Sequence, residues 1–232
     1  MVERGETSVS NTPIVVFDLD GTLVDSAPDL LGSLNFCLEQ EGLKTFEPVD
    51  IRRLVGMGGR IMIERALSFQ NIKPDNEHVE HLLSVFMRHY EENMPGKTQF
   101  FEGADKALTK LSNAGYKLAV CTNKYENLAR HLLEGIGEAN RFVTIVGGDT
   151  FAYHKPDARH ILSTIERAGC SPEKAVMVGD SQTDILAAQS ADIPVIAVDF
   201  GYTDKPVSTF NPTKIISHYD ELTPQLVAGY LM

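Results

Sequence analysis

An unbroken apolar run near the N-terminus is the clearest feature of the hydrophobic pattern. Residues 14–17 read Ile-Val-Val-Phe, which is typical of a strand buried on both faces of a parallel sheet. The run stops at Asp18, and Asp20, Gly21 and Thr22 follow directly. The predicted strand therefore places two carboxylates at its carboxyl end, where ligands bind in open parallel sheets.

The segment after this strand shows only helical periodicity. Ser26 and Asp29 have the spacing of a capping box, and apolar residues then recur at helical intervals until Gly42. Further helical segments are predicted within 48–55, 61–69 and 75–94. We therefore interpret residues 25–94 as an inserted all-helical domain.

From residue 95 onward, apolar strands alternate with helices. Strands are predicted at 117–121, 142–146, 175–178 and 193–198, and helices at 102–113, 124–134, 156–168, 181–190 and from about residue 223. This alternation is typical of right-handed βαβ units that build a parallel sheet. The expected fold class is α/β, with a Rossmann-like parallel sheet core formed by residues 1–24 and 95–232 and interrupted by the helical insertion.

Composition and charge indicate which binding partners and which cellular location to expect. The formal net charge of −11 disfavours nucleic acid, because binding a phosphate backbone requires a basic face. No run of about 18 apolar residues is present, so no membrane span is expected, and residues 1–12 read as a polar lead-in rather than a secretory signal. The cysteines Cys37, Cys121 and Cys170 are odd in number and widely spaced, which favours a reducing cytoplasm.

The two carboxylates after the first strand suit general acid and base chemistry. Gly21 permits a turn in which Asp18 and Asp20 converge on one cavity. Neighbouring carboxylates repel each other, which separates their pKa values and allows one to act as a nucleophile and the other as an acid and base. The alternative is a turn that merely ends the strand. A calcium-binding EF-hand loop fits poorly, because Leu23 occupies the position that needs glycine.

Two later segments carry residues suited to a phosphate group. Thr122 and Asn123 follow a predicted strand, where a hydroxyl and backbone N–H groups suit a phosphate oxygen, although either residue could simply cap the next helix. Lys155 precedes Pro156 at a predicted helix start and could neutralise a phosphoryl group, although a solvated surface lysine is the plainer interpretation.

A third segment carries carboxylates suited to a metal ion. Asp180 follows the predicted strand at 175–178, and Asp184 lies in the first turn of the next helix. Carboxylate oxygens suit Mg²⁺, which prefers octahedral oxygen coordination. Ser181 and Asp184 also satisfy a capping box, so Asp184 has a purely structural alternative that does not apply to Asp180.

Taken in order, these segments resemble the four motifs of the haloacid dehalogenase superfamily. The matching residues are Asp-Leu-Asp-Gly-Thr at 18–22, Thr122, Lys155-Pro156 and Gly-Asp-Ser-x-Thr-Asp at 179–184. The helical segment 25–94 is similar to the small cap domain of that superfamily. Within the superfamily the chain looks most similar to bacterial phosphoglycolate phosphatases, on the residues at 18–29, 147–150 and 200–202.

The resemblance implies a mechanism and a cofactor. Asp18 would attack phosphorus to form a phosphoaspartyl intermediate, and Asp20 would protonate the leaving alkoxide and then activate water. Mg²⁺ would be held by Asp18, by the main-chain carbonyl of Asp20 and by Asp180, with Asp184 as a ligand or a neighbour.

The resemblance also assigns the residues that contact substrate. The phosphoryl group would be bound by Gly21, Thr22, Thr122, Asn123 and Lys155. The glycine-rich cap loop would reach the other end of the substrate through Gly58, Gly59 and Arg60, with Arg60 on the substrate carboxylate.

The expected protein is a cytoplasmic monomer or homodimer that hydrolyses a small phosphorylated metabolite, 2-phosphoglycolate being the substrate that the resemblance favours. A β-phosphoglucomutase-like mutase, a pyrophosphatase and a sugar-phosphate phosphatase would show the same core motifs. A phospho-acceptor or binding module without turnover represents a different class. A dehalogenase is disfavoured, because dehalogenases of the superfamily lack the second aspartate, here Asp20.

Overall fold

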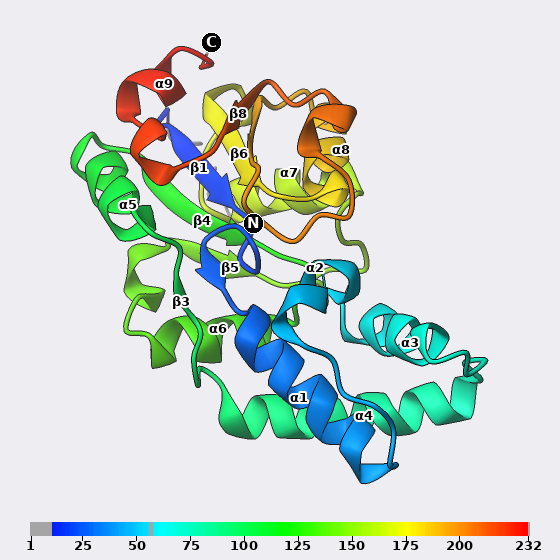
Figure 1. Ribbon diagram of the computed structural model, residues 1–232. Coiled ribbons are helices and arrows are strands. Elements are labelled where there is room, and N and C mark those ends of the chain that lie inside the picture. Colours follow the sequence, from blue (N-terminus) through cyan, green and yellow to red (C-terminus); the bar gives the residue numbers. More distant parts are fainter. Residues whose placement is uncertain (1–10, 56–57, 232) are drawn as a thin grey trace, which may run out of the picture.

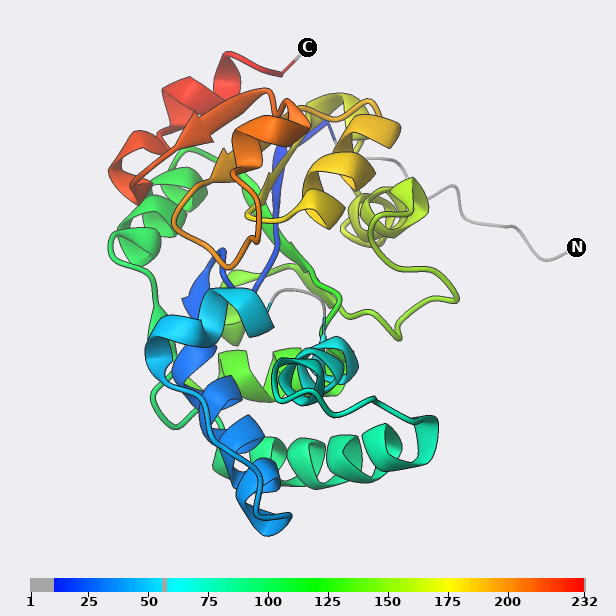
Figure 2. The ribbon, with the colours of Figure 1, turned by 45° about the vertical axis from the view of Figure 1, so that its right-hand side comes forward.

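The computed structural model describes residues 11–55 and 58–231 (Figures 1 and 2). The expectations for the lead-in up to residue 10 and for Gly56 and Met57 fall outside these residues. A six-stranded parallel sheet, in the order β5-β4-β1-β6-β7-β8, forms the centre of the molecule. Its strands are β1 (Ile14–Phe17), β4 (Lys117–Cys121), β5 (Thr144–Val146), β6 (Ala175–Gly179), β7 (Val195–Val198) and β8 (Lys214–Ile216).

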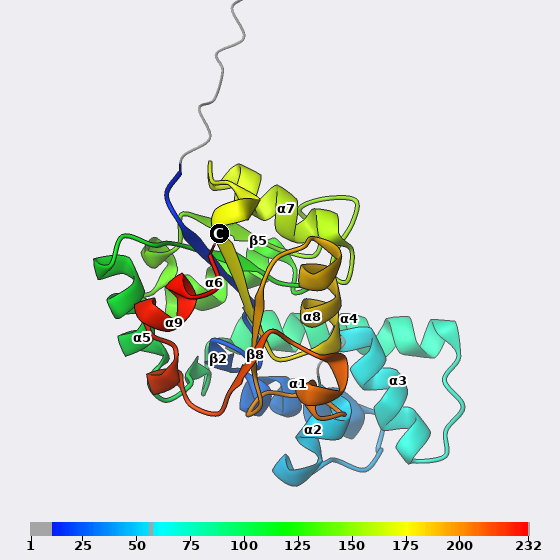
Figure 3. The ribbon, with the colours of Figure 1, turned by 90° about the horizontal axis from the view of Figure 1, so that it is seen from above.

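Helices cover both faces of the sheet, which explains the continuous apolar strands. The side chains of Val15 and Phe17 in β1 pack on the face covered by α5 and α6, whereas Ile14 and Val16 pack on the face covered by α7 and α8. Figure 3 shows α7 and α8 on the side of the sheet opposite α5 and α9. The helices are α5 (Ala104–Asn113), α6 (Glu126–Gly135), α7 (Ala158–Arg167), α8 (Gln182–Ser190) and α9 (Pro224–Ala228).

Four helices follow β1 in the sequence and lie beyond the carboxyl ends of the strands, at the bottom of Figure 1. The helix α4 packs against both α1 and α3, and Leu34 and Phe86 are buried among these helices. We call this group the cap. Its helices are α1 (Ala27–Gln40), α2 (Ile51–Leu54), α3 (Gly59–Phe69) and α4 (Asn76–Asn93).

A short antiparallel ribbon, absent from the sequence prediction, connects cap and core. The strand β2 (Val24–Asp25) leaves the core and pairs with β3 (Gln99–Phe100), which returns to it. The predicted helical insertion therefore begins with a strand residue at Asp25. Both strands are only two residues long, which is too short for a periodic pattern to identify.

The predicted capping box of Ser26 and Asp29 is wrong, because both side chains have partners elsewhere. The Ser26 hydroxyl donates to Asp20 Oδ1 at 2.5 Å. The Asp29 carboxylate accepts from the backbone N–H of Lys97 at 2.7 Å and of Thr98 at 3.0 Å, and so ties the start of α1 to the returning chain. At the start of α1, the Tyr202 hydroxyl instead accepts a hydrogen bond from the Ala27 N–H at 2.9 Å.

The edge strand β8 is also absent from the sequence prediction, whereas the remaining differences from the predicted elements are small. The helix expected from Pro156 begins two residues later, where the Asp157 side chain accepts from the Arg159 N–H.

No helix in the described part of the chain combines the length and the apolar character needed to cross a membrane. Single turns of 3-10 helix lie at Pro48–Asp50, Ala139–Arg141, Pro172–Lys174, Val207–Phe210 and Tyr219–Glu221.

Candidate active site

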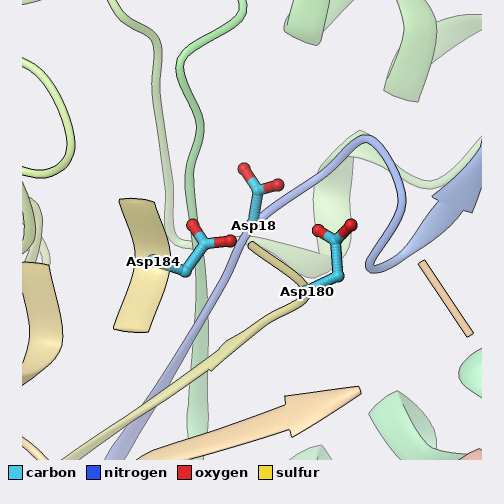
Figure 4. A group of neighbouring side chains, drawn as sticks. All are labelled: Asp18, Asp180 and Asp184. Carbon is cyan, nitrogen blue, oxygen red and sulfur yellow. The ribbon is translucent and has the colours of Figure 1, made fainter. Parts of the chain in front are cut away.

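The carboxyl ends of three neighbouring strands bring the predicted polar residues together. Asp18 follows β1, Thr122 follows β4 and Asp180 follows β6, with β1 between the other two strands. Figure 4 shows Asp18, Asp180 and Asp184 beside one another. All three are buried, and each contributes a carboxylate oxygen to a group whose members lie within 4.8 Å of one another. We call these three residues the carboxylate cluster.

Lys155 lies inside this cluster rather than on the surface. Its Nζ donates to Asp18 Oδ1 at 2.7 Å, to Asp184 Oδ1 at 2.6 Å and to the main-chain oxygen of Cys121 at 2.6 Å. An ammonium group has three N–H donors, so these contacts use all of them. The alternative of a solvated surface lysine is therefore wrong.

Asn123 fixes the backbone of Lys155. Its side-chain oxygen accepts from the Lys155 N–H at 3.0 Å, and its amide nitrogen donates to the Lys155 carbonyl at 2.9 Å. Neither Asn123 nor Thr122 caps the next helix, because Tyr125 occupies the N-cap position of α6. The Thr122 hydroxyl is buried and accepts from the Lys124 N–H at 3.2 Å.

Asp180 is held between two loops. Its carboxylate accepts from the Thr22 hydroxyl at 2.9 Å and from the Tyr202 N–H at 2.8 Å. A Cβ atom would lie 2.6 Å from Asp180 Oδ2 at Gly21, whose φ is +85°, and 2.3 Å from it at Gly201. The two glycines are therefore needed for the loops to approach Asp180 closely. Gly201 and Tyr202 therefore belong to the site, although no pattern in the sequence marks them as site residues.

The Asp184 carboxylate serves two partners at once. Its Oδ1 accepts from Lys155, and its Oδ2 accepts from the Ser181 N–H at 3.0 Å and the Ser181 hydroxyl at 2.6 Å. The predicted capping box at the start of α8 is confirmed. Asp184 therefore orients Lys155 from the first turn of a helix.

The carboxylate cluster carries more negative charge than Lys155 balances. Burial raises the pKa of Asp18 to about 6, an effect that Lys155 opposes and Asp184 strengthens. Burial, together with the charges of Asp184 and Asp18, raises the pKa of Asp180 to about 8. Three buried carboxylates with hard oxygen donors fit a divalent cation such as Mg²⁺, which would supply the missing positive charge.

Asp20 has a partner that the sequence analysis did not identify. Lys124 Nζ lies 3.1 Å from Asp20 Oδ2 and 3.3 Å from Oδ1, and it also donates to the Tyr90 hydroxyl at 2.8 Å. Tyr90 belongs to α4, so this contact links the cap to the core. The signal in the sequence was the position of Lys124 directly after Thr122 and Asn123 at a strand end.

The predicted cap residues lie at the start of α3. Gly58 occupies the N-cap position and Gly59 is the first residue of the helix. The Arg60 guanidinium pairs with Glu64 at 3.2 Å and also with Glu80. None of the hydrogen bonds described for Arg60 reaches the carboxylate cluster. Its contact with a substrate carboxylate stays a prediction.

Cys121 is not a nucleophile in this site. Its thiol is buried at the end of β4, and burial raises its pKa to about 11. The thiol is therefore kept protonated near neutral pH, as is typical of a cysteine buried in a core.

Comparison with protein families identifies the group to which the chain belongs. Residues 15–198 match the model of the haloacid dehalogenase-like hydrolases, which spans most of the sheet and the whole cap. The chain belongs to the haloacid dehalogenase-like hydrolase family. The recognition made from the four sequence motifs is therefore confirmed.

Individual haloacid dehalogenase-like relatives match the chain along nearly its full length. A phosphoglycolate phosphatase of Mesorhizobium japonicum is 51% identical over 214 residues, covering 92% of this chain and 94% of the relative. A phosphoglycolate phosphatase of Agrobacterium fabrum is 47% identical over 220 residues, covering 95% of this chain and 94% of the relative. A crystal structure from Haemophilus somnus, described as a predicted phosphoglycolate phosphatase, gives a TM-score of 0.83 at 28% identity and covers 92% of this chain and 97% of that chain. The expected α/β fold class is confirmed.

Proposed function

We propose that this chain is a phosphomonoester hydrolase that converts 2-phosphoglycolate into glycolate and inorganic phosphate, with Mg²⁺ as cofactor. The names of two relatives that are 51% and 47% identical to this chain support the reaction and the substrate. The mechanism depends on one observation. Asp18 and Asp20 are separated by a single residue, and each forms an ion pair with a different lysine, Lys155 for Asp18 and Lys124 for Asp20. This arrangement gives the two carboxylates different surroundings and therefore different roles.

In the first step, Asp18 is the nucleophile. Lys155 binds Asp18 Oδ1, and we assign the second oxygen, Oδ2, to the attack on phosphorus. The bond between phosphorus and the ester oxygen breaks as the bond to Asp18 forms. Asp20 donates its proton to the departing alkoxide, so glycolate leaves as the neutral alcohol at that oxygen.

In the second step, Asp20 acts as a base. It removes a proton from water, the water oxygen attacks phosphorus, and the bond to Asp18 breaks to return the carboxylate and release phosphate. Asp20 is suited to both steps because it is only partly buried, and Ser26 and Lys124 fix its orientation.

The phosphoryl oxygens are assigned to groups around Asp18. Thr122 supplies a buried hydroxyl, and Lys155 supplies positive charge next to the nucleophile. The Asn123 side chain is engaged on the Lys155 backbone, so we assign it a positioning role in addition to its predicted one. Gly21 and Thr22 contribute through the turn that carries the nucleophile and through the contact with Asp180.

Mg²⁺ would be held by the carboxylates of Asp18 and Asp180 and by the main-chain carbonyl of Asp20. When bound, it neutralises the cluster and polarises a phosphoryl oxygen. Both Asp184 oxygens already accept hydrogen bonds from Lys155 and Ser181, which favours Asp184 as a neighbour of the ion that positions Lys155.

A phosphate-release screen tests this proposal. Purified protein is incubated with 2-phosphoglycolate, pyrophosphate, several sugar phosphates, or glucose 1-phosphate plus a sugar bisphosphate, each with Mg²⁺ or with EDTA. We expect steady release of phosphate from 2-phosphoglycolate that requires Mg²⁺ and exceeds release from the other compounds. Formation of glucose 6-phosphate would instead indicate a mutase, and a single stoichiometric phosphorylation would indicate a phospho-acceptor.

Asp18→Asn separates the mechanism from contaminating activity. Because the substitution removes the nucleophile with little change in volume, we expect kcat to fall by at least about a thousand-fold while the fold is kept. The matched control is Asp192→Asn, at an exposed residue with φ of 55°, a conformation that asparagine tolerates well. Retained turnover in Asp18→Asn, measured as phosphate release, contradicts the assignment of the nucleophile.

A further inference from the structure

Lys124 is a buried cation that the hydrolytic steps above do not use directly. Its side chain is only 7% exposed, although it lies at the junction of cap and core. The residue sits between β4 and α6, and its main-chain oxygen accepts from the Gly148 N–H at 2.8 Å. A cation so far removed from water requires anionic or polar partners, and Asp20 and Tyr90 provide them here.

The position of Lys124 relative to Asp20 places it on the leaving-group side of the site. In the proposed reaction, Asp20 protonates the ester oxygen, so that oxygen must lie within hydrogen-bond distance of the Asp20 carboxyl group. Lys155, by contrast, holds the nucleophile, Asp18. The two lysines therefore divide the site into a phosphoryl side and a leaving-group side.

The geometry of 2-phosphoglycolate matches this division. A single methylene separates the ester oxygen from the carboxylate, so the carboxylate oxygens lie roughly 3 Å from the ester oxygen. The substrate carboxylate must then lie close to Asp20 in a region largely shielded from water, where a cation must stand beside the substrate carboxylate to offset the loss of its hydration. Lys124 Nζ, which is 3.1 Å from Asp20 Oδ2, is placed to do so.

Tyr90 completes the site from the cap. Lysine has no acceptor, so Lys124 donates to the Tyr90 hydroxyl, and the hydroxyl proton of Tyr90 points away from the ammonium group. Burial raises the pKa of Tyr90, which keeps that proton in place near neutral pH. Lys124 Nζ lies 3.1 and 3.3 Å from the two Asp20 oxygens, which can share one N–H, so that a third N–H is left for the substrate. That N–H and the phenol proton, side by side, can bind the two oxygens of one carboxylate.

We propose that Lys124 and Tyr90 bind the carboxylate of the substrate and thereby select phosphate esters of small hydroxy acids over those of neutral alcohols. This inference rests on the proposed function and names the residues that recognise its substrate. Because Lys124 belongs to the core and Tyr90 to the cap, the acid group of the substrate joins the two domains directly. Arg60, whose guanidinium is paired with Glu64 and Glu80, is not required for this recognition.

The test compares two substrates that differ only at the acid group. The rates are kcat/KM for 2-phosphoglycolate and for 2-hydroxyethyl phosphate, in which a hydroxymethyl group replaces the carboxylate. The ratio of the two rates cancels any general effect that a substitution exerts through Asp20. For Lys124→Met we expect the ratio to fall by roughly 10- to 100-fold, the range for loss of a hydrogen bond to a charged group. For Tyr90→Phe we expect a smaller fall, and Lys124→Arg should restore part of the ratio.

Control variants make the outcome specific. Lys110→Met removes an exposed lysine of α5 and should leave the ratio unchanged. Equal losses on both substrates in Lys124→Met, or a carboxylate-selective loss in Arg60→Ala but not in Lys124→Met, would overturn the inference while leaving the proposed function intact. If Lys124→Met does not fold, Tyr90→Phe, which deletes a single hydroxyl, decides by the same ratio. Absence of 2-phosphoglycolate turnover in the unmodified protein would refute the proposed function itself.

Discussion

At the scale of single residues, the site is defined by how a few buried charges share their partners. The sequence predicted which residues could take part in catalysis and that they lie at strand ends. An apolar run that is followed by Asp18 or Asp180 can be recognised directly in the sequence. The pairings could not be predicted. That Lys155 divides its donors among Asp18, Asp184 and a main-chain oxygen depends on contacts across as many as 137 positions of the chain.

Lys124 illustrates the same limit. An isolated lysine is usually solvated, and the one local signal for Lys124, its position directly after Thr122 and Asn123 at a strand end, does not indicate that its side chain is buried. Its burial follows from the approach of α4, which carries Tyr90 and lies in a separate part of the sequence. A tertiary contact of this kind leaves no periodic trace.

The raised pKa of Asp180 predicts how the protein without metal responds to pH. A carboxyl group whose pKa is about 8 when folded and 3.8 when unfolded binds more protons in the folded state between those values. The stability that it contributes is therefore present at low pH and is lost as pH rises toward 8. Asp18, with a pKa of about 6, acts in the same direction.

Asp180→Asn should remove this penalty. The asparagine oxygen can still accept from the Tyr202 N–H, and its amide can donate to the Thr22 hydroxyl, so packing is kept. In EDTA at pH 8 we expect the variant to melt about 3 °C or more above the unmodified protein, with the difference closing as pH falls toward 4. Thermal melts with Mg²⁺ provide the second measurement, in which the ion should raise the Tm of the unmodified protein more than that of the variant. Equal shifts would show that Asp180 does not hold the metal.

At the scale of elements, the strands could be predicted better than the connections. The core strands are buried on both faces, so their continuous apolar runs stand out, as β1 and β6 show. The edge strand β8 and the ribbon of β2 and β3 are three and two residues long and lack such runs. The capping box at Ser26 failed for a different reason: Asp20 and the chain at Lys97 and Thr98 compete for its two side chains.

The loop after β7 should tolerate no side chain at Gly201. A Cβ atom there would lie 2.3 Å from the Asp180 side chain, so the loop or the carboxylate must move. We expect Gly201→Ala to lower kcat/KM by roughly 10- to 100-fold at limiting Mg²⁺, the range for loss of groups that orient metal ligands, and to raise the Mg²⁺ concentration needed for half-maximal activity.

Gly32→Ala is the matched control. This glycine lies inside α1, and apart from its chain neighbours and the adjoining backbone of the helix, no heavy atom lies within 4 Å of the position that a Cβ would take. The substitution should stabilise the protein by roughly 0.5–1 kcal/mol, because alanine favours the helix, and should leave the Mg²⁺ dependence unchanged. If both variants show the same Mg²⁺ dependence, the close approach at Gly201 does not control the metal ligand. Phosphate release across a Mg²⁺ titration makes the comparison.

At the scale of the whole molecule, cap and core meet on two sides of the site. One such contact is that of Tyr90 with Lys124, and another is the ion pair of Arg65 in α3 with Asp204 in the loop after β7, at 2.8 Å. A cleft of about 780 Å³ adjoins the second contact, and its lining includes Phe69 of the cap. Arg65 and Asp204 both line this cleft, so their ion pair joins the cap to the core beside it.

Asp204→Asn should weaken this contact between cap and core modestly. The two side chains are 24% and 46% exposed, so solvent screens the pair and its contribution is small. We expect KM to rise by no more than about five-fold at low ionic strength and the difference to vanish near about 0.5 M NaCl, where surface charges are screened. Asp192→Asn serves again as the control. A rise in KM that persists at high salt would show that Asp204 acts through something other than this ion pair.

The ribbon of β2 and β3 has a consequence for how such a protein can change over evolutionary time. Paired residues in an antiparallel ribbon have Cα atoms about 5 Å apart, so the chain leaves the core at Val24 and re-enters opposite it at Phe100. The chain therefore passes from the core into the intervening segment and back at one place, although the segment also contacts the core elsewhere. Any segment whose two ends lie side by side could be inserted between β2 and β3, from a tight hairpin turn to a larger domain. The cap can thus be exchanged for another inserted segment without any change in the order of the core strands.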